Sequence, residues 1–341
     1  MKSVLQRVMS LVGVNRCRRM TMTTRRSKKP RLAILPSSKK DPTGIDRLER
    51  KAMKDFARRI KKVGKIYKDA LERFPASLAI NARYEYQLDP VLLNMVLNDA
   101  SILTDAVLVE GDQNNNWFTE NYVEVAVVRG TAQTFANLSQ QSATYLADRQ
   151  SLQSLLMSEP YQRRMTLVYT RVFEEMKGLS AEVKRNMGRV LTEGIGRGLH
   201  PSVVAKNLTA QAGIEKRRSN RIARTELTTA LRRARWDEAD EASRDLGLNI
   251  RLLHYSALSP TTRQSHAIRH AHLYTTEEVR RWYAIGANAI NCKCSQVEVL
   301  VDVKGNPPNS KIIEMAQGEY KRYMALAANH SHHCCGHQHA A

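Results

Sequence analysis

Apolar residues recur every three or four positions between residues 45 and 71, and this spacing strongly constrains the fold. Because an α-helix repeats about every 3.6 residues, side chains at this spacing form one continuous stripe along a helix. The stripe consists of Ile45, Leu48, Ala52, Phe56, Ile60, Val63, Tyr67 and Leu71. The pattern predicts a long amphipathic helix whose apolar side packs on a larger body.

Similar periodicity predicts further helices over residues 91–108, 119–146, 161–177, 180–196, 201–212 and 215–246. Ser180 is the expected N-cap of one helix, and Gly247 is the expected C-cap of another. Residues 250–255 and 296–303 have strand composition and are expected to share a small sheet covered by the 215–246 helix. The predicted fold class is mainly α, with helical N-terminal and middle regions and a small α+β domain near the C-terminus.

The formal net charge is +21, and it is unevenly distributed. Residues 1–80 hold 23 Lys and Arg against 6 Asp and Glu, whereas residues 81–160 hold 3 against 10. A basic end followed by an acidic middle favours two different partners over one uniformly adhesive surface.

The N-terminal region combines clustered basic residues with prolines at positions 30, 36 and 42, which is typical of an unpacked arm. It has no aromatic residue, so contact with nucleic acid would be made to phosphates and not by base stacking. The predicted DNA-binding residues are Arg16, Arg18, Arg19, Arg25, Arg26, Lys28, Lys29 and Arg31 in the arm, and Arg58, Arg59, Lys61, Lys62 and Lys65 on the polar face of the 45–71 helix.

No run of eighteen or more apolar residues occurs, so no membrane span is expected. The five cysteines include a Cys-x-Cys pair, which is too close for ordinary bridging, and a disulfide scaffold is not expected. Residues 1–30 are basic and lack acidic residues, a composition that also describes a transit peptide of the mitochondrial type.

Three short motifs occur in order between residues 223 and 294. The first is Ala-Arg-Thr-Glu at residues 223–226, the second contains Arg263 and His266, and the third is Asn-Cys-Lys-Cys at residues 291–294. Their order and spacing resemble the head-morphogenesis domain of the phage Mu gpF / SPP1 gp7-like minor head protein family. The family's acidic residue before the arginine is absent here, and His270-Ala271 replaces its usual Asp-Gly.

The resemblance implies a bacteriophage minor head protein that binds the portal protein inside the procapsid. It also implies contact with packaged double-stranded DNA, and roles in head morphogenesis and genome ejection. Scaffold or major capsid protein would be further partners, and the expected location is the capsid interior near the portal, after assembly in the host cytoplasm. The expected structural residues of the motifs are Arg224, Thr225, Glu226, Arg263, His266 and Asn291.

Four parts of the chain follow from this interpretation. They are a basic flexible arm (1–44), a helical region (45–178), the head-morphogenesis domain (179–305), and a C-terminal helix with a His- and Cys-rich tail (306–341).

The sequence predicts no catalytic residue and no cofactor. A structural zinc ion is the one alternative. His266, His270, Cys292 and Cys294 could form a tetrahedral structural zinc site, with the two histidines four residues apart on one helical face. The opposing interpretation is that the cysteines are small buried apolar groups and His266 a hydrogen-bonded core residue.

Two alternative functions stay open. One is a nucleic-acid-processing or transferase enzyme that uses Arg224, Glu226 and His266, although no phosphate-binding loop or nucleophile elbow is present. The other is a general nucleic-acid-binding protein with an N-terminal targeting segment.

Overall fold

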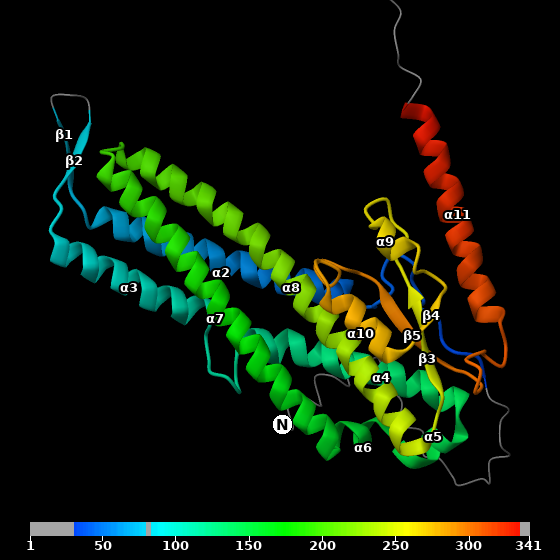
Figure 1. Cartoon of the computed structure of the whole chain (residues 1–341). Helices are drawn as coiled ribbons and strands as arrows, with labels where there is room; N and C mark the ends of the chain where they lie inside the picture. Colours follow the sequence, from blue (N-terminus) through cyan, green and yellow to red (C-terminus); the bar gives the residue numbers. More distant parts are fainter. Residues whose placement is uncertain (1–30, 80–82, 335–341) are drawn as a thin grey trace, which may run out of the picture.

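The computed structural model describes residues 31–79 and 83–334, and within these ranges the chain is mainly helical with two small sheets (Figure 1). The predicted fold class is therefore confirmed. The predicted DNA-binding residues Arg16, Arg18, Arg19, Arg25, Arg26, Lys28 and Lys29 lie outside the described residues.

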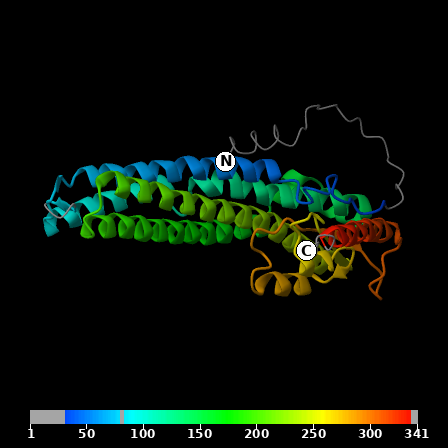
Figure 2. The same ribbon diagram turned by 90° about the horizontal axis from the view of Figure 1, so that it is seen from above.

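Four long helices form an elongated bundle, with the C-terminal elements gathered at one end (Figure 2). These helices are α2 (Asp46–Glu72), α3 (Pro90–Leu108), α7 (Glu159–Gly196) and α8 (Pro201–Leu246). Strands β1 (Ala76–Leu78) and β2 (Tyr84–Tyr86) pair antiparallel at the far tip of the bundle (Figure 1).

The predicted stripe of α2 lies inside this bundle. Seven of its eight residues are buried, and Leu48 is half-buried against the same core. The Phe56 ring lies 4.9 Å from that of Trp117 and 5.1 Å from that of Phe118, so α2 is fixed to the chain that follows α3. Amphipathic spacing thus identified both the helix and its buried side.

The breaks predicted within the 161–196 and 201–246 regions do not occur. Helix α7 begins after the N-cap Ser158, and Ser180 lies in its interior, where its hydroxyl donates to Asp105 Oδ1. Helix α8 likewise continues through Gly213. An interior glycine costs a helix only about 1 kcal/mol, and packing against neighbouring helices offsets this cost. The domain boundary predicted between residues 178 and 179 falls inside α7.

The region predicted as one helix over 119–146 is divided. It contains a π-helical turn (Thr119–Val123), α4 (Glu124–Gln141) and α5 (Ala143–Arg149), followed by α6 (Leu152–Met157). The division between α4 and α5 lies at Ser142, whose extended backbone lets its hydroxyl accept from Tyr145 N. A side-chain cap therefore starts a new helix there.

The C-terminal sheet has the strand order β4-β3-β5 and is antiparallel throughout. Its strands are β3 (Ile250–Tyr255), β4 (Leu273–Tyr274) and β5 (Ser295–Leu300). The predicted pairing of the two segments is confirmed, with Leu252 opposite Glu298. Helices α4 and α8 pack on the sheet, and Gly247 ends α8 in the left-handed conformation, as expected of a C-cap.

Three further helices complete the C-terminal region: α9 (Gln264–Ala267), α10 (Thr276–Ala284) and α11 (Lys311–Cys334). Helix α10 has a capping box, in which Thr275 and Glu278 satisfy each other's backbone N–H groups.

The prediction of a flexible arm is wrong for residues 31–44. Arg31 N donates to Gln140 O at 2.9 Å, and Ile34 N donates to Asn137 Oδ1 at 2.7 Å. Ala33 is buried in a cluster with Leu253 and Val297 of the sheet. This extended segment is held by residues more than a hundred positions away, which local composition could not show.

Among the described residues, one helix, α3, is long and apolar enough to cross a membrane by length and composition. Only 22% of its most apolar window is buried, so much of its apolar surface faces outward.

Candidate functional site

The three sequence motifs meet beside the C-terminal half of α8. Arg224 Nη1 donates to Asn291 Oδ1 at 2.9 Å, and Asn291 N donates to Thr225 Oγ1 at 3.0 Å. We refer to Arg224, Thr225, Arg263 and Asn291 as the motif junction. Asn291 has φ of 57°, a left-handed conformation that asparagine tolerates better than most residues.

Arg263 holds the loop that precedes Asn291. Its guanidinium donates to the carbonyl oxygens of Ala287 at 2.6 Å, Asn288 at 3.2 Å and Ile290 at 3.1 Å. Because one rigid, planar group satisfies three carbonyls, the loop is fixed in position. The motif junction therefore joins this loop to α8 through hydrogen bonds, which is a structural role.

The other side of Arg224 reaches α2. Arg224 Nε donates to Glu49 Oε2 at 2.9 Å, and nearby Lys293 Nζ lies 2.7 Å from Asp46 Oδ2. Burial raises the pKa of Glu49 to about 6, although the hydrogen bond and charge of Arg224 oppose this rise. The roles of Glu49 and Asp46 are not apparent in the sequence, because these residues lie 175 and 247 positions from their partners.

Three side chains next to the motif junction form a cluster, which we call the thiol cluster: His266, Cys292 and Cys294. Their potential ligand atoms lie within 4.8 Å of one another, and all three residues are buried. His266 Nδ1 lies 3.4 Å from Cys292 Sγ and 3.5 Å from Cys294 Sγ. The hydrogen bond from Cys294 lowers the pKa of the Cys292 thiol despite burial, and the charge of Arg232 lowers it further.

Arg232 is buried against this cluster. Its Nη1 lies 3.4 Å from Cys292 O and 3.5 Å from Cys294 O, and its guanidinium stacks 4.3 Å from the Tyr283 ring centroid. No carboxylate pairs with Arg232 in the part of the chain that the structure describes. The thiol cluster thus lies beside an uncompensated positive charge.

The predicted fourth metal ligand, His270, does not join the thiol cluster. Helix α9 ends at Ala267, so His270 is not on one helical face with His266. Its Nδ1 instead accepts from Ser256 N at 3.0 Å, and its Nε2 lies 3.9 Å from Glu319 Oε2. The four-ligand set inferred from the spacing of the histidines is therefore wrong, because the helix is only four residues long.

Glu226 also lies apart from the motif junction. It pairs with Arg171 of α7, with 2.6 Å between Glu226 Oε2 and Arg171 Nη1. Residues two apart on a helix point in different directions, so Arg224 and Glu226 bind different neighbours. They do not form a joint catalytic pair.

The thiol cluster and three residues of the motif junction, Arg224, Arg263 and Asn291, border a polar cavity of about 180 Å³. Its other lining residues are Ser256, Ala257, Ser259, Thr261, Thr262 and Lys293. Hydroxyl groups and basic side chains therefore face the same small space.

The predicted DNA-binding residues of α2 differ in exposure. Lys61, Lys62 and Lys65 are exposed, and Arg58 is exposed beside Asp55. Arg59 instead stacks 3.9 Å from the Trp117 ring centroid and pairs with Glu110, and only 15% of its side chain is exposed. Arg59 therefore contributes to packing within the bundle and is less available than the lysines for contact with DNA. In the 31–44 segment, Arg31 is exposed.

Comparison with known proteins gives one family match. The sequence model of the family described as Phage Mu protein F like protein matches residues 185–297, about a third of the chain. The matched segment contains the motif junction and the thiol cluster. No curated protein and no solved structure matches the chain. Residues 185–297 are therefore similar to this family of phage proteins.

Proposed function

Because this chain contains a domain of the Phage Mu protein F like family, we propose that it is a minor head protein that binds the portal inside the procapsid and contacts packaged double-stranded DNA. The observation that carries the proposal is that the family model matches the segment containing Arg224, Arg263 and Asn291, whose hydrogen bonds join the loop to α8. The Arg263 guanidinium donates hydrogen bonds to three backbone carbonyls, and Arg224 donates to Glu49 and Asn291. Such groups build a scaffold and leave no free acid or base at the junction, which favours assembly over catalysis.

DNA contact is supported by the charge distribution. The basic residues before position 30 precede a segment that packs on the sheet, and the exposed lysines of α2 add positive charge to the bundle. Each phosphate that a basic residue neutralises releases counterions, so binding would be strongly salt-dependent and independent of sequence. A role in genome ejection would use the same contacts.

A salt series tests this contact in the full chain. Changing Arg16, Arg18, Arg19, Arg25, Arg26, Lys28 and Lys29 to glutamine is expected to weaken duplex binding and to reduce the slope of log K against log salt by about 0.9 for each lost phosphate contact. Changing the exposed Arg163, Arg189 and Arg281, whose side chains are 72%, 57% and 69% exposed, serves as the control. An unchanged slope in the arm variant would remove DNA contact by this region from the proposal.

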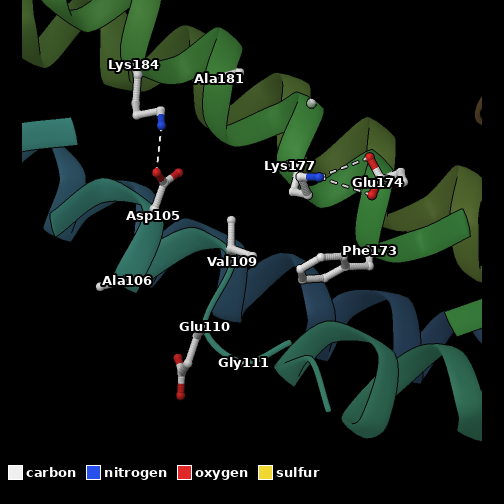
Figure 3. Close-up of a pocket in the computed structure, with 11 residues that line it drawn as sticks. Asp105, Ala106, Val109, Glu110, Gly111, Phe173, Glu174, Lys177, Ala181 and Lys184 are labelled. Carbon is white, nitrogen blue, oxygen red and sulfur yellow. Dashed lines mark hydrogen bonds and ion pairs between the residues drawn. The ribbon is translucent and has the colours of Figure 1, made fainter. Parts of the chain in front are cut away.

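The face proposed for the portal protein is the outer side of α3. Leu88, Val91, Met95, Ile102 and Leu103 are between 48% and 65% exposed, an unusual concentration of apolar surface. Beside it, a groove of about 750 Å³ lies between the end of α3 and α7. Figure 3 shows Val109 and Phe173 at this groove, with the Asp105–Lys184 and Glu174–Lys177 pairs flanking it.

Substitution on this face tests partner binding. The double change Val91→Asp and Ile102→Asp is expected to reduce capture of purified portal protein at least tenfold, because it places charge in an apolar contact. Leu167→Asp, at a position 68% exposed on α7, is the matched control and is expected to bind normally. Equal capture by both variants would exclude the α3 face. Binding of the unaltered chain to lipid vesicles in place of portal protein would assign the face to a membrane.

A further inference from the structure

The thiol cluster brings together three ligands of the two types that zinc prefers, one imidazole and two thiols. His266 comes from α9, whereas Cys292 and Cys294 come from the segment leading into β5. With Zn–S bonds of about 2.3 Å and Zn–N bonds of about 2.0–2.1 Å, neighbouring ligand atoms of a tetrahedral site lie roughly 3.5 Å apart. The observed separations of 3.4 and 3.5 Å between His266 Nδ1 and the two sulfur atoms match this requirement.

The surroundings are suited to cysteines that bind as thiolates. Cys294 N donates to Cys292 Sγ at 3.4 Å, and Arg232 places a fully buried positive charge beside both residues. Thiolates, and not thiols, are the metal-binding form of cysteine. Arg232 has no carboxylate partner among the described residues, so thiolate ligands at Cys292 and Cys294 would supply its counter-charge.

The described residues supply three ligands and not four. His270 binds Ser256 N, and His272 Nδ1 lies 3.0 Å from His270 O, so neither histidine completes the set. All three members of the thiol cluster line the polar cavity of about 180 Å³. That cavity is large enough for several water molecules, since each occupies about 30 Å³ in the liquid.

We propose that His266, Cys292 and Cys294 bind one zinc ion, with a water molecule from the polar cavity in the fourth position. Such an ion joins α9 to the loop that Arg263 and Asn291 fix, and it adds a cross-link between two segments of the C-terminal region. The proposal is independent of portal and DNA binding.

Metal analysis of the purified full chain is the first test. We expect about one zinc per chain after dialysis, and near-complete loss of zinc in Cys292→Ser and in Cys294→Ser. His272→Ala, and a chain with Cys334→Ser and Cys335→Ser in the tail, are the controls and are expected to keep the ion. Zinc retained by Cys292→Ser, or lost on changing the tail cysteines, would overturn the assignment.

Cobalt substitution of the unaltered chain tests thiolate binding without relying on the folding of variants. Co²⁺ added to the metal-free full chain is expected to give a thiolate-to-cobalt charge-transfer band and intense visible bands of four-coordinate cobalt. His266→Ala should weaken or shift these bands, whereas His272→Ala should leave them unchanged. A chain that binds no zinc and gives only the weak spectrum of hydrated cobalt would show that the thiol cluster is a hydrogen-bonded core.

Discussion

Replacing Glu298 by glutamine is expected to lower the free energy of unfolding by about 3–5 kcal/mol, because Arg235 is then left buried without its counter-charge. Arg235 donates to Glu298 through Nη2 at 2.6 Å and Nε at 2.8 Å, and the Glu298 side chain is fully buried. Thr134 and Asn137 of α4 donate to the same carboxylate at 2.8 Å. The pair therefore joins α8, β5 and α4, and urea-induced unfolding would measure its loss.

An exposed ion pair provides the control. Glu277→Gln breaks an i,i+4 pair with Arg281, and the Glu277 side chain is 79% exposed. Solvent screening limits such pairs to less than about 1 kcal/mol, so this variant should unfold almost like the unaltered chain. Equal destabilisation by the two substitutions would contradict the importance of the buried pair.

The same pair predicts a pH dependence. Burial by itself would raise the pKa of Glu298, but the charge and hydrogen bonds of Arg235 hold it below the ordinary value of 4.5. A carboxyl group with a lowered pKa in the folded state contributes stability that is complete above pH 4.5 and is lost as the pH falls toward the lower value. The difference in stability between the unaltered chain and Glu298→Gln should therefore shrink below pH 4.5.

Changing Gly130 to alanine is expected to destabilise the fold by about 1–3 kcal/mol through overpacking. Gly130 lies on α4 where it crosses α8, and a Cβ there would lie 2.3 Å from Leu231 O and 3.1 Å from Ala234 Cβ. The first contact is with backbone, so relief requires the two helices to separate. Thermal unfolding followed by circular dichroism would measure the effect.

Gly188→Ala is the matched control for this substitution. Gly188 lies inside α7, and a Cβ there would have no neighbour within 4 Å. Alanine is favoured over glycine in a helix by about 1 kcal/mol, so this variant should be more stable than the unaltered chain. The two substitutions are thus expected to have opposite signs, and stabilisation by both would show that α4 and α8 can separate freely.

The order of the motifs in the sequence predicted some of the residues at the candidate site but not all of them. Arg224, Arg263 and Asn291 occur in a familiar order along the chain. In the structure Arg224 donates to Asn291, and Arg263 donates to backbone carbonyls of the loop that precedes Asn291. Arg235 and Glu298 were missed, although their contact fixes the sheet on α8. From sequence alone, a charged residue in a strand is expected to be exposed to solvent. The packing of α4 and α8 against β5 shows that Glu298 is fully buried.

The sequence by itself determined the helical class, the buried stripe of α2, the pairing of β3 with β5, and the order of the motifs. These features follow from local periodicity and from side chains near one another in the chain. Tertiary structure decided that residues 31–44 pack on the sheet, that α7 continues through Ser180, and that His266 meets the cysteines without His270. The reason is that each of these outcomes depends on contacts with partners distant in the sequence, whose free energies local patterns do not contain.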